Sequence, residues 1–154
     1  MIEYKKGNIF ESGAEAIVNT VNCVGVMGRG LALQCKVLYP KNYEAYRSAC
    51  DAGEVRIGKM FVCDMQRQTN PKYIINFPTK RHWRFPSKME YITKGLSDLA
   101  GTIRRIGVKS VAIPPLGCGL GGLDWNKVRQ LIEIAVWDLP EVNVAIYDEQ
   151  FLNY

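Results

Sequence analysis

The sequence predicts an α/β fold of three layers, in which helices cover both faces of a mixed sheet of about six strands. Short apolar runs alternate along the chain with longer segments of helical periodicity, as in strands that are joined through helices. The chain has 154 residues, is 47% hydrophobic and contains no long polar tract. We therefore expect a single compact domain over residues 1–154, with ligands bound at the carboxyl ends of the strands.

The first half of the chain is expected to begin with two strands and to continue with two helices. The strands are predicted at residues 1–4 and 16–22, and the helices at residues 31–39 and 42–52. Pro40 ends the first helix, because proline lacks an amide hydrogen and clashes with the preceding turn. Gly53 suits the left-handed conformation that often ends a helix.

The middle of the chain predicts a hairpin followed by a long helix. Residues 60–64 and 73–77 are β-like and flank the polar segment QRQTNP, so we expect them to pair. Ser87 and Glu90 form a capping box, in which each side chain bonds the other residue's backbone amide. Apolar residues then recur at spacings of three and four, which is typical of a buried helix face. They are Met89, Ile92, Leu96, Leu99, Ile103 and Ile106.

A last strand, helix and strand are expected to complete the sheet. The strands are predicted at residues 110–115 and 142–147. Asp124 is expected to cap the helix between them, since a carboxylate accepts hydrogen bonds from the first free amides. The buried face of this helix consists of Val128, Leu131, Ile132, Ala135 and Val136.

Composition excludes several classes of protein. Five cysteines without a paired CxxC spacing, together with a single histidine, favour neither a disulfide framework nor a zinc site. Because no apolar run is long enough to span a membrane and the N-terminus does not resemble a signal peptide, we expect a soluble cytoplasmic protein. The net charge of +5 favours an anionic partner such as nucleic acid, although a solvated surface also explains it. No cofactor is expected.

Two glycine-rich turns are the most informative motifs. NTVNCVGVMGRG at residues 19–30 and PPLGCGLGGL at residues 114–123 each follow a predicted strand and precede a helical pattern. Glycines in such turns let backbone N–H groups approach a diphosphate at a helix N-terminus. A nucleotide diphosphate is therefore the expected ligand, and tight turns without a ligand are the alternative.

Two other phosphate-binding motifs fit the sequence less well. Gly117, Gly119 and Gly122 formally spell the dinucleotide fingerprint GxGxxG, with Glu141 downstream. A dinucleotide-binding half needs further strand–helix units after its fingerprint, and only one strand is predicted to follow. Neither turn continues into GK[ST], so a P-loop is also excluded.

The segments IVNTVNCVGVMGRGLA and IPPLGCGLGGL together resemble the macrodomain family of ADP-ribose-binding α/β/α modules, over essentially the whole chain. INFPTKRHWRFPSKMEYI is similar to the DarG-type antitoxin branch, which is related to the terminal ADP-ribose glycohydrolases. In that branch, the lysine at the position of Lys80 is catalytic. The resemblance implies removal of ADP-ribose from thymidine bases of single-stranded DNA, reversing the modification made by a cognate DarT-type toxin.

The same resemblance assigns ADP-ribose contacts. Asn8 and Ile9 correspond to the turn that recognises adenine, where an asparagine replaces the usual acid. Asn22 corresponds to the contact with the distal ribose, which Gly28 and Gly30 let the loop approach; an Asx turn is its alternative. The diphosphate loop corresponds to Leu116, Gly117, Cys118, Gly119, Leu120 and Gly121. We expect Cys118 to be a small packing residue rather than a nucleophile.

Lys80 is the predicted catalytic residue, acting through its free amine. Repulsion from Arg81, Arg84 and Lys88 is expected to lower the pKa of Lys80. The amine then either attacks the anomeric carbon and forms a Schiff base, or acts as a general base. Gly121 stands where protein-directed relatives have an assisting aspartate, which favours a DNA substrate with a thymine leaving group.

The segment KRHWRFPSK interleaves aromatic and basic residues, as single-stranded nucleic acid sites do. Arg81, Trp83 and Arg84 are therefore the predicted DNA contacts, unless the aromatic rings only anchor the loop to the domain. Two other functions stay open at this point. They are hydrolysis of ADP-ribose esters on proteins or of O-acetyl-ADP-ribose, and noncatalytic binding of ADP-ribose.

Overall fold

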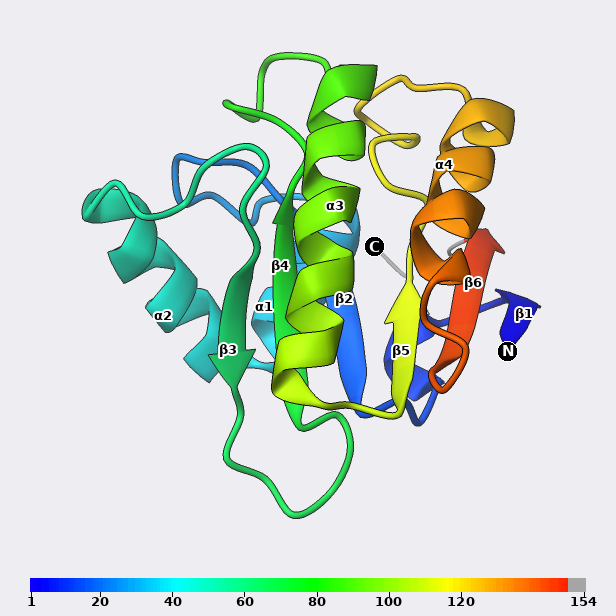
Figure 1. Cartoon of the computed structure of the whole chain (residues 1–154). Helices are drawn as coiled ribbons and strands as arrows, with labels where there is room; N and C mark the ends of the chain where they lie inside the picture. The colour runs from blue at the N-terminus through cyan, green and yellow to red at the C-terminus, as the bar shows by residue number, and fades with distance from the viewer. Residues whose placement is uncertain (150–154) are drawn as a thin grey trace.

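The computed structural model describes residues 1–149 and has the predicted alternation of strands and helices (Figure 1). The strands are β1 (Ile2–Lys6), β2 (Ala16–Val21), β3 (Phe61–Asp64), β4 (Tyr73–Pro78), β5 (Ser110–Ile113) and β6 (Asn143–Glu149). The helices are η1 (Ile9–Glu11), α1 (Gly30–Leu38), α2 (Pro40–Asp51), α3 (Met89–Ile106) and α4 (Trp125–Trp137), of which η1 is a short 3-10 turn. Within residues 1–149, no helix is long and apolar enough to cross a membrane.

The six strands form one mixed sheet in the order β1-β6-β5-β2-β4-β3. Neighbouring strands are parallel except for the hairpin of β3 and β4, which is antiparallel as predicted. The carboxyl ends of β2, β4 and β5 therefore lie at the same edge of the sheet. All three loops that follow these strands lie at this edge, at the top of Figure 1.

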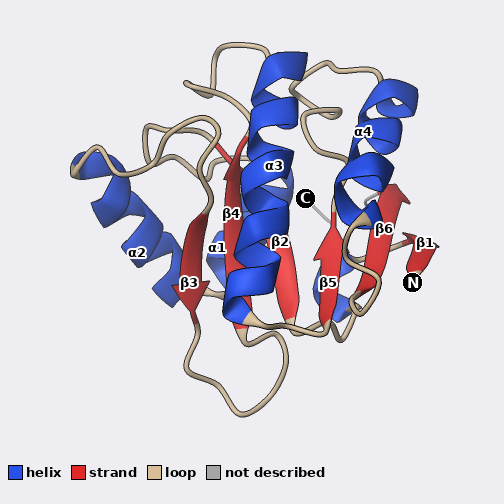
Figure 2. Cartoon of the chain, viewed as in Figure 1, coloured by secondary structure: helices blue, strands red, loops and turns tan. Residues whose placement is uncertain are grey.

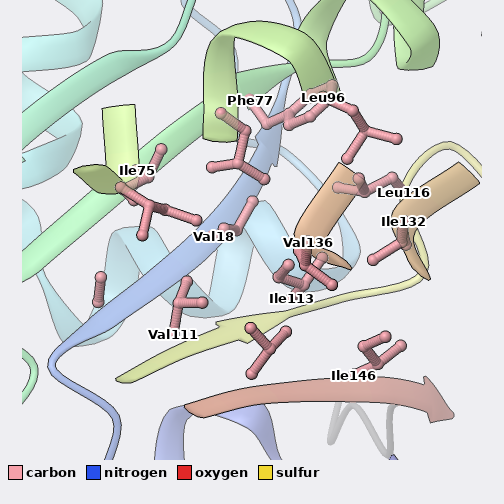
Figure 3. Packing of buried hydrophobic residues seen from close by; sticks show 14 of the residues in the cluster. Val18, Ile75, Phe77, Leu96, Val111, Ile113, Leu116, Ile132, Val136 and Ile146 are labelled. Atoms are coloured by element: carbon pink, nitrogen blue, oxygen red, sulfur yellow. The ribbon is translucent and has the colours of Figure 1, made fainter. Parts of the chain in front are cut away.

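Helices cover both faces of the sheet and confirm the three-layer prediction (Figure 2). The largest buried cluster joins the sheet to α3 and α4, where side chains from strands and helices interdigitate (Figure 3). Two smaller clusters join the opposite face to α1 and α2. In α3, a Cβ atom on Gly95 would overlap the ring of Phe77, so glycine lets this helix approach β4 closely.

Helix ends confirm some local predictions and correct others. Asp124 caps α4 by accepting a hydrogen bond from the backbone N–H of Asn126. The predicted capping box before α3 is wrong, because the Ser87 hydroxyl donates to the Thr79 carbonyl and Lys88 takes the capping position. Pro40 ends α1 as predicted but is also the first residue of α2, where proline's missing N–H needs no partner.

A network of buried asparagines ties the sheet to α2. Asn19 on β2 and Asn76 on β4 are directly paired in register, and the Asn19 side chain donates to Asn76 Oδ1 at 3.1 Å. Asn42 on α2 exchanges two side-chain hydrogen bonds with Asn76, at 2.8 and 3.2 Å. Because all three side chains are fully buried, these bonds fix how β2, β4 and α2 sit together.

Candidate functional site

Three loops are joined by backbone hydrogen bonds at the carboxyl edge of the sheet. The pairing of β2 with β4 continues past the strands, since the N–H of Thr79 donates to Val21 O at 2.9 Å and that of Cys23 to Arg81 O at 3.2 Å. The N–H of Ser87 donates to Gly121 O at 3.0 Å, in the loop after β5. Residues 22–29, 79–88 and 114–123 thus form one assembly.

Lys80 lies in the middle of this assembly. Its neighbours in the chain are both hydrogen-bonded to the β2 segment, Thr79 to the last residue of the strand and Arg81 to Cys23 in the loop. Its own carbonyl accepts from Cys23 Sγ at 3.5 Å. The side chain is half-buried, and this burial lowers its pKa below 10.5 by disfavouring the charged amine. The direction agrees with the prediction, but the cause is burial rather than repulsion from neighbouring cations.

Asn22 is buried and holds the first glycine loop together. Its Oδ1 accepts from the backbone N–H groups of Val24 and Val26 and, at 2.8 Å, from the hydroxyl of Tyr46. Its Nδ2 donates to Val26 O at 2.8 Å. The Asx turn weighed as the alternative is therefore present, and the ribose contact of Asn22 stays a prediction.

The first glycine loop needs its glycines for different reasons. Gly25 has a φ of +84° and packs its backbone against α2, where a Cβ atom would lie 3.6 Å from Cys50 Cβ. Gly30 has a φ of +57° at the first residue of α1, and Gly28 is exposed. Sequence reasoning missed Gly25, although it lies within the quoted motif.

The second glycine loop contains glycines that pack closely and glycines that are open to solvent. A Cβ atom on Gly117, whose φ is +72°, would lie 2.8 Å from Leu123 Cδ1. A Cβ atom on Gly121 would overlap the Gly117 carbonyl oxygen and lie 2.9 Å from Ser87 Cβ. Gly119 is exposed, and a Cβ atom there would meet nothing within 4 Å. Gly122, whose φ is +81°, is also exposed with nothing within 4 Å of a built Cβ. Gly119 and Gly122 are therefore the positions at which a ligand can approach this loop's backbone.

The side chains of the second loop have distinct environments. Leu116 is fully buried and Leu120 is 66% exposed, so of these two leucines Leu120 is the one whose side chain can contact a ligand. Burial, with a smaller contribution from Asp124, raises the pKa of the Cys118 thiol to about 11. The thiol also donates to Leu116 O at 3.4 Å. This environment disfavours a thiolate, which agrees with a packing role for Cys118.

The predicted adenine turn lies at the carboxyl end of β1, at the same edge of the sheet. Asn8 caps η1, because its Oδ1 accepts from the N–H of Phe10 at 2.9 Å. The Ile9 side chain is fully buried, so only its backbone can contact a ligand. Both adenine contacts stay predictions.

An aromatic cluster occupies the loop after Lys80. The His82 ring lies 5.2 Å from that of Trp83 and 5.3 Å from that of Phe85, between ring centroids. The Arg84 guanidinium lies 4.7 Å above the Trp83 ring. Arg81 turns toward α3, where its Nε donates to the Tyr91 hydroxyl at 3.2 Å.

Two surface hollows, of about 530 and 240 Å³, lie along α1 and α2. The smaller one reaches the first glycine loop at Val24–Gly28. Among the described residues, the linings of these two hollows do not include Lys80 or the second glycine loop. The candidate site is therefore defined by the three hydrogen-bonded loops rather than by either hollow.

Comparison with known proteins identifies a matching family model and similar curated proteins. The family model described as Macro domain matches residues 18–132. The chain is 56% identical over 147 residues to the DNA ADP-ribosyl glycohydrolase of Mycobacterium tuberculosis, which covers 96% of this chain and 42% of that protein. It is 51% identical over 148 residues to the protein of the same name from Thermus aquaticus, covering 96% and 41%. The chain thus spans about two fifths of the length of these curated relatives.

Solved structures agree with the sequence relatives. The macrodomain of Mycobacterium tuberculosis DarG superimposes with a TM-score of 0.94 at 56% identity, over 96% of this chain and 97% of that one. Thermosipho africanus DarTG in complex with ADP-ribose superimposes with a TM-score of 0.84 at 35% identity, over 94% of this chain and 40% of that one. The curated protein from that organism is a DNA ADP-ribosyl transferase–DNA ADP-ribosyl glycohydrolase fusion protein.

Proposed function

Because the chain belongs to the Macro domain family, we propose that it binds ADP-ribose at the three-loop assembly and hydrolyses the bond between the distal ribose and a thymine base of single-stranded DNA. The observation that carries this proposal is the position of Lys80, a half-buried lysine with a lowered pKa whose carbonyl bonds Cys23 of the first glycine loop. The names of the relatives from Mycobacterium tuberculosis and Thermus aquaticus support the same reaction.

The glycine loops supply binding in this proposal. Exposed backbone at Gly28 and Gly119 gives the diphosphate and the distal ribose room to approach, and backbone N–H groups donate to the phosphate oxygens. Asn22 and the turn at Asn8 contact the distal ribose and adenine. The Thermosipho africanus relative, whose structure contains ADP-ribose, supports this ligand.

Lys80 supplies the chemistry, by one of two routes. In the first, its neutral amine attacks the anomeric carbon, the carbon–nitrogen bond to thymine breaks, and the base takes up a proton. Opening of the sugar ring in this adduct, with the ring oxygen taking up the proton that the amine nitrogen loses, gives a Schiff base, and addition of water then releases ADP-ribose and the amine. In the second, the amine removes a proton from the attacking water, which displaces thymine directly. Only the first route leaves a sugar on Lys80 after reduction with borohydride.

The test compares the protein with Lys80→Ala on an oligonucleotide carrying ADP-ribosyl thymidine and, separately, on protein carrying glutamyl-ADP-ribose. We expect ADP-ribose release from DNA that is lost in Lys80→Ala, while Lys80→Ala still binds free ADP-ribose in calorimetry. Lys127→Ala, which changes an exposed lysine on α4, is the control and keeps full activity. Release from protein alone indicates an ester hydrolase, and binding without release indicates a noncatalytic module.

The proposal also includes a DarT-type transferase as the toxin partner and the cytoplasm as the location of the protein. The fusion protein of Thermosipho africanus combines a DNA ADP-ribosyl transferase with a DNA ADP-ribosyl glycohydrolase in one chain, which supports opposing reactions. We therefore expect a cognate DarT-type transferase to make the modified DNA that this chain repairs. Coexpression in bacteria tests this: the chain relieves growth arrest by the transferase, and Lys80→Ala does not.

A further inference from the structure

Residues 82–85 present two exposed aromatic rings immediately after Lys80. Trp83 is 48% exposed and Phe85 is 58% exposed, although their rings adjoin the same histidine ring. Large aromatic side chains bury much apolar area when they pack, so two of them left in solvent on one short loop require an explanation. The proposed hydrolysis uses Lys80 and the glycine loops, and gives these rings no role.

The backbone of this loop attaches it to the body of the domain. Backbone hydrogen bonds anchor it, from Cys23 to the Arg81 carbonyl and from Ser87 to the Gly121 carbonyl. Within the loop, the N–H of Arg84 donates to His82 Nδ1 at 3.1 Å, and the N–H of Phe85 donates to His82 O at 3.1 Å. The loop is therefore held by polar contacts, and the exposed parts of Trp83 and Phe85 are available to a ligand.

The positive charge around the rings favours binding of a polyanion. Residues 79–88 contain no acidic residue; their cations are Lys80, Arg81, Arg84 and Lys88. The Arg84 guanidinium already lies over one face of the Trp83 ring, and an arginine in this position can also donate to a phosphate. Exposed rings flanked by cations are the arrangement by which proteins hold unpaired bases.

We propose that Trp83 and Phe85 form a stacking platform for an unpaired base next to the modified nucleotide, with Arg84 contacting the phosphate between the two nucleotides. The proposal rests on the proposed function, because the modified base lies at Lys80 and its neighbours in the DNA strand extend over the following loop. The platform binds single-stranded rather than double-stranded DNA, since paired bases cannot offer their faces to Trp83 and Phe85. It makes the protein prefer a modified strand over a modified nucleoside.

The experiment measures kcat/KM for two substrates, ADP-ribosyl thymidine nucleoside and a single-stranded oligonucleotide with one ADP-ribosyl thymidine. We expect Trp83→Ala and Phe85→Ala each to lower kcat/KM for the oligonucleotide about tenfold, the effect of losing one base stack, and to leave the nucleoside unchanged. Trp137→Ala is the matched control, because Trp137 is 79% exposed on α4. Circular dichroism verifies that each variant is folded.

The outcomes separate this proposal from the proposed function. Equal kcat/KM for nucleoside and oligonucleotide in the unchanged protein, or a Trp83→Ala variant that behaves like Trp137→Ala, overturns the platform while hydrolysis stands. Absence of release from both substrates overturns the proposed function instead. In that case, binding of an unmodified fluorescent oligonucleotide still decides the platform, which predicts weaker binding by Trp83→Ala and Phe85→Ala but not by Trp137→Ala.

Discussion

At the scale of single residues, Lys80 differs from an exposed lysine because its half-buried side chain loses part of its hydration. Desolvation disfavours the ammonium form, so the pKa of Lys80 lies below 10.5 and the neutral amine appears at lower pH than in an exposed lysine. Both proposed routes need that neutral amine. The reactivity of Lys80 therefore depends on where β4 ends and on the residues that cover the chain just after that strand.

The pH dependence of the reaction tests this. We predict that kcat/KM for the modified oligonucleotide rises with pH, because the neutral amine increases, and levels off at a pH below 10.5. Lys80→Arg keeps the charge but cannot supply a neutral amine, so it should show no turnover at any pH in the same assay. A rate that falls as pH rises through this range would mean that Lys80 acts in its protonated form.

Cys118 illustrates the opposite case, a reactive residue type made inert by its surroundings. Its thiol pKa of about 11 leaves very little thiolate at neutral pH. We predict that Cys118→Ala retains hydrolysis within about twofold, since a single small side chain in a packing role contributes little to the transition state. Mass spectrometry after brief iodoacetamide treatment should find Cys118 unmodified in the folded protein. Rapid alkylation together with inactivation would instead identify a nucleophile.

At the scale of elements, two glycines of α3 have opposite meanings. Alanine normally stabilises a helix interior by about 1 kcal/mol relative to glycine. A Cβ atom on Gly101 would meet nothing within 4 Å, whereas one on Gly95 would overlap the Phe77 ring. We predict that Gly101→Ala raises the free energy of unfolding by roughly 0.5–1 kcal/mol. Gly95→Ala should lower it by about 1–2 kcal/mol, because overpacking exceeds the gain in propensity.

Urea denaturation of both variants measures this difference. Because Phe77 lies three residues before Lys80, Gly95→Ala should also disturb the active loop and lower kcat/KM for the modified oligonucleotide, whereas Gly101→Ala should not. Equal stabilisation by the two substitutions would show that α3 does not pack against β4 as closely as the structure indicates.

The second glycine loop allows a similar comparison of two glycine-to-alanine substitutions. A Cβ atom on Gly121 has no room beside Gly117 and Ser87, so Gly121→Ala should lower the free energy of unfolding by about 1–3 kcal/mol. Gly119 has open space and a φ outside the left-handed range, so Gly119→Ala should change stability by less than about 0.5 kcal/mol. If the diphosphate lies on this backbone, Gly119→Ala should weaken ADP-ribose binding about tenfold in calorimetry. Unchanged affinity would move the diphosphate elsewhere.

Periodicity allowed most elements to be predicted from the sequence, and the exceptions have physical reasons. The apolar spacing of residues 89–106 predicts α3, because a buried helix face repeats every three to four residues regardless of its partners. The Ser87–Glu90 capping box failed because a local motif competes with tertiary contacts, and the Thr79 carbonyl, eight residues away, is the acceptor that the fold brings to Ser87. The isolated turn η1 is too short to produce a period.

At the scale of the whole molecule, the site depends on contacts between segments that are far apart in the chain. The resemblance indicated Lys80, but its placement needs Cys23 to bond Arg81 and Gly121 to bond Ser87, and no spacing in the sequence encodes these pairs. The buried asparagines are a similar case. Asn19 and Asn76 interrupt apolar strands, which was a usable signal, yet only the register shows that they face each other.

Net charge also acts at the scale of the whole molecule, because it should affect binding of the DNA strand more than binding of ADP-ribose. The surplus of five positive charges and the acid-free segment 79–88 attract a polyanion, and each neutralised phosphate of a single strand contributes about 0.7 to the slope of log K against log salt. We predict that Arg84→Gln reduces the magnitude of this slope for an unmodified oligonucleotide by about 0.7. Trp83→Ala should weaken binding without changing the slope, because stacking releases no counterions. Fluorescence anisotropy over a salt series measures both variants.

Free ADP-ribose, which is expected to be held largely by backbone donors, should show a shallower slope than the oligonucleotide, and Arg84→Gln should leave the ADP-ribose slope unchanged. A changed ADP-ribose slope in Arg84→Gln would place Arg84 at the diphosphate rather than on the path of the DNA strand.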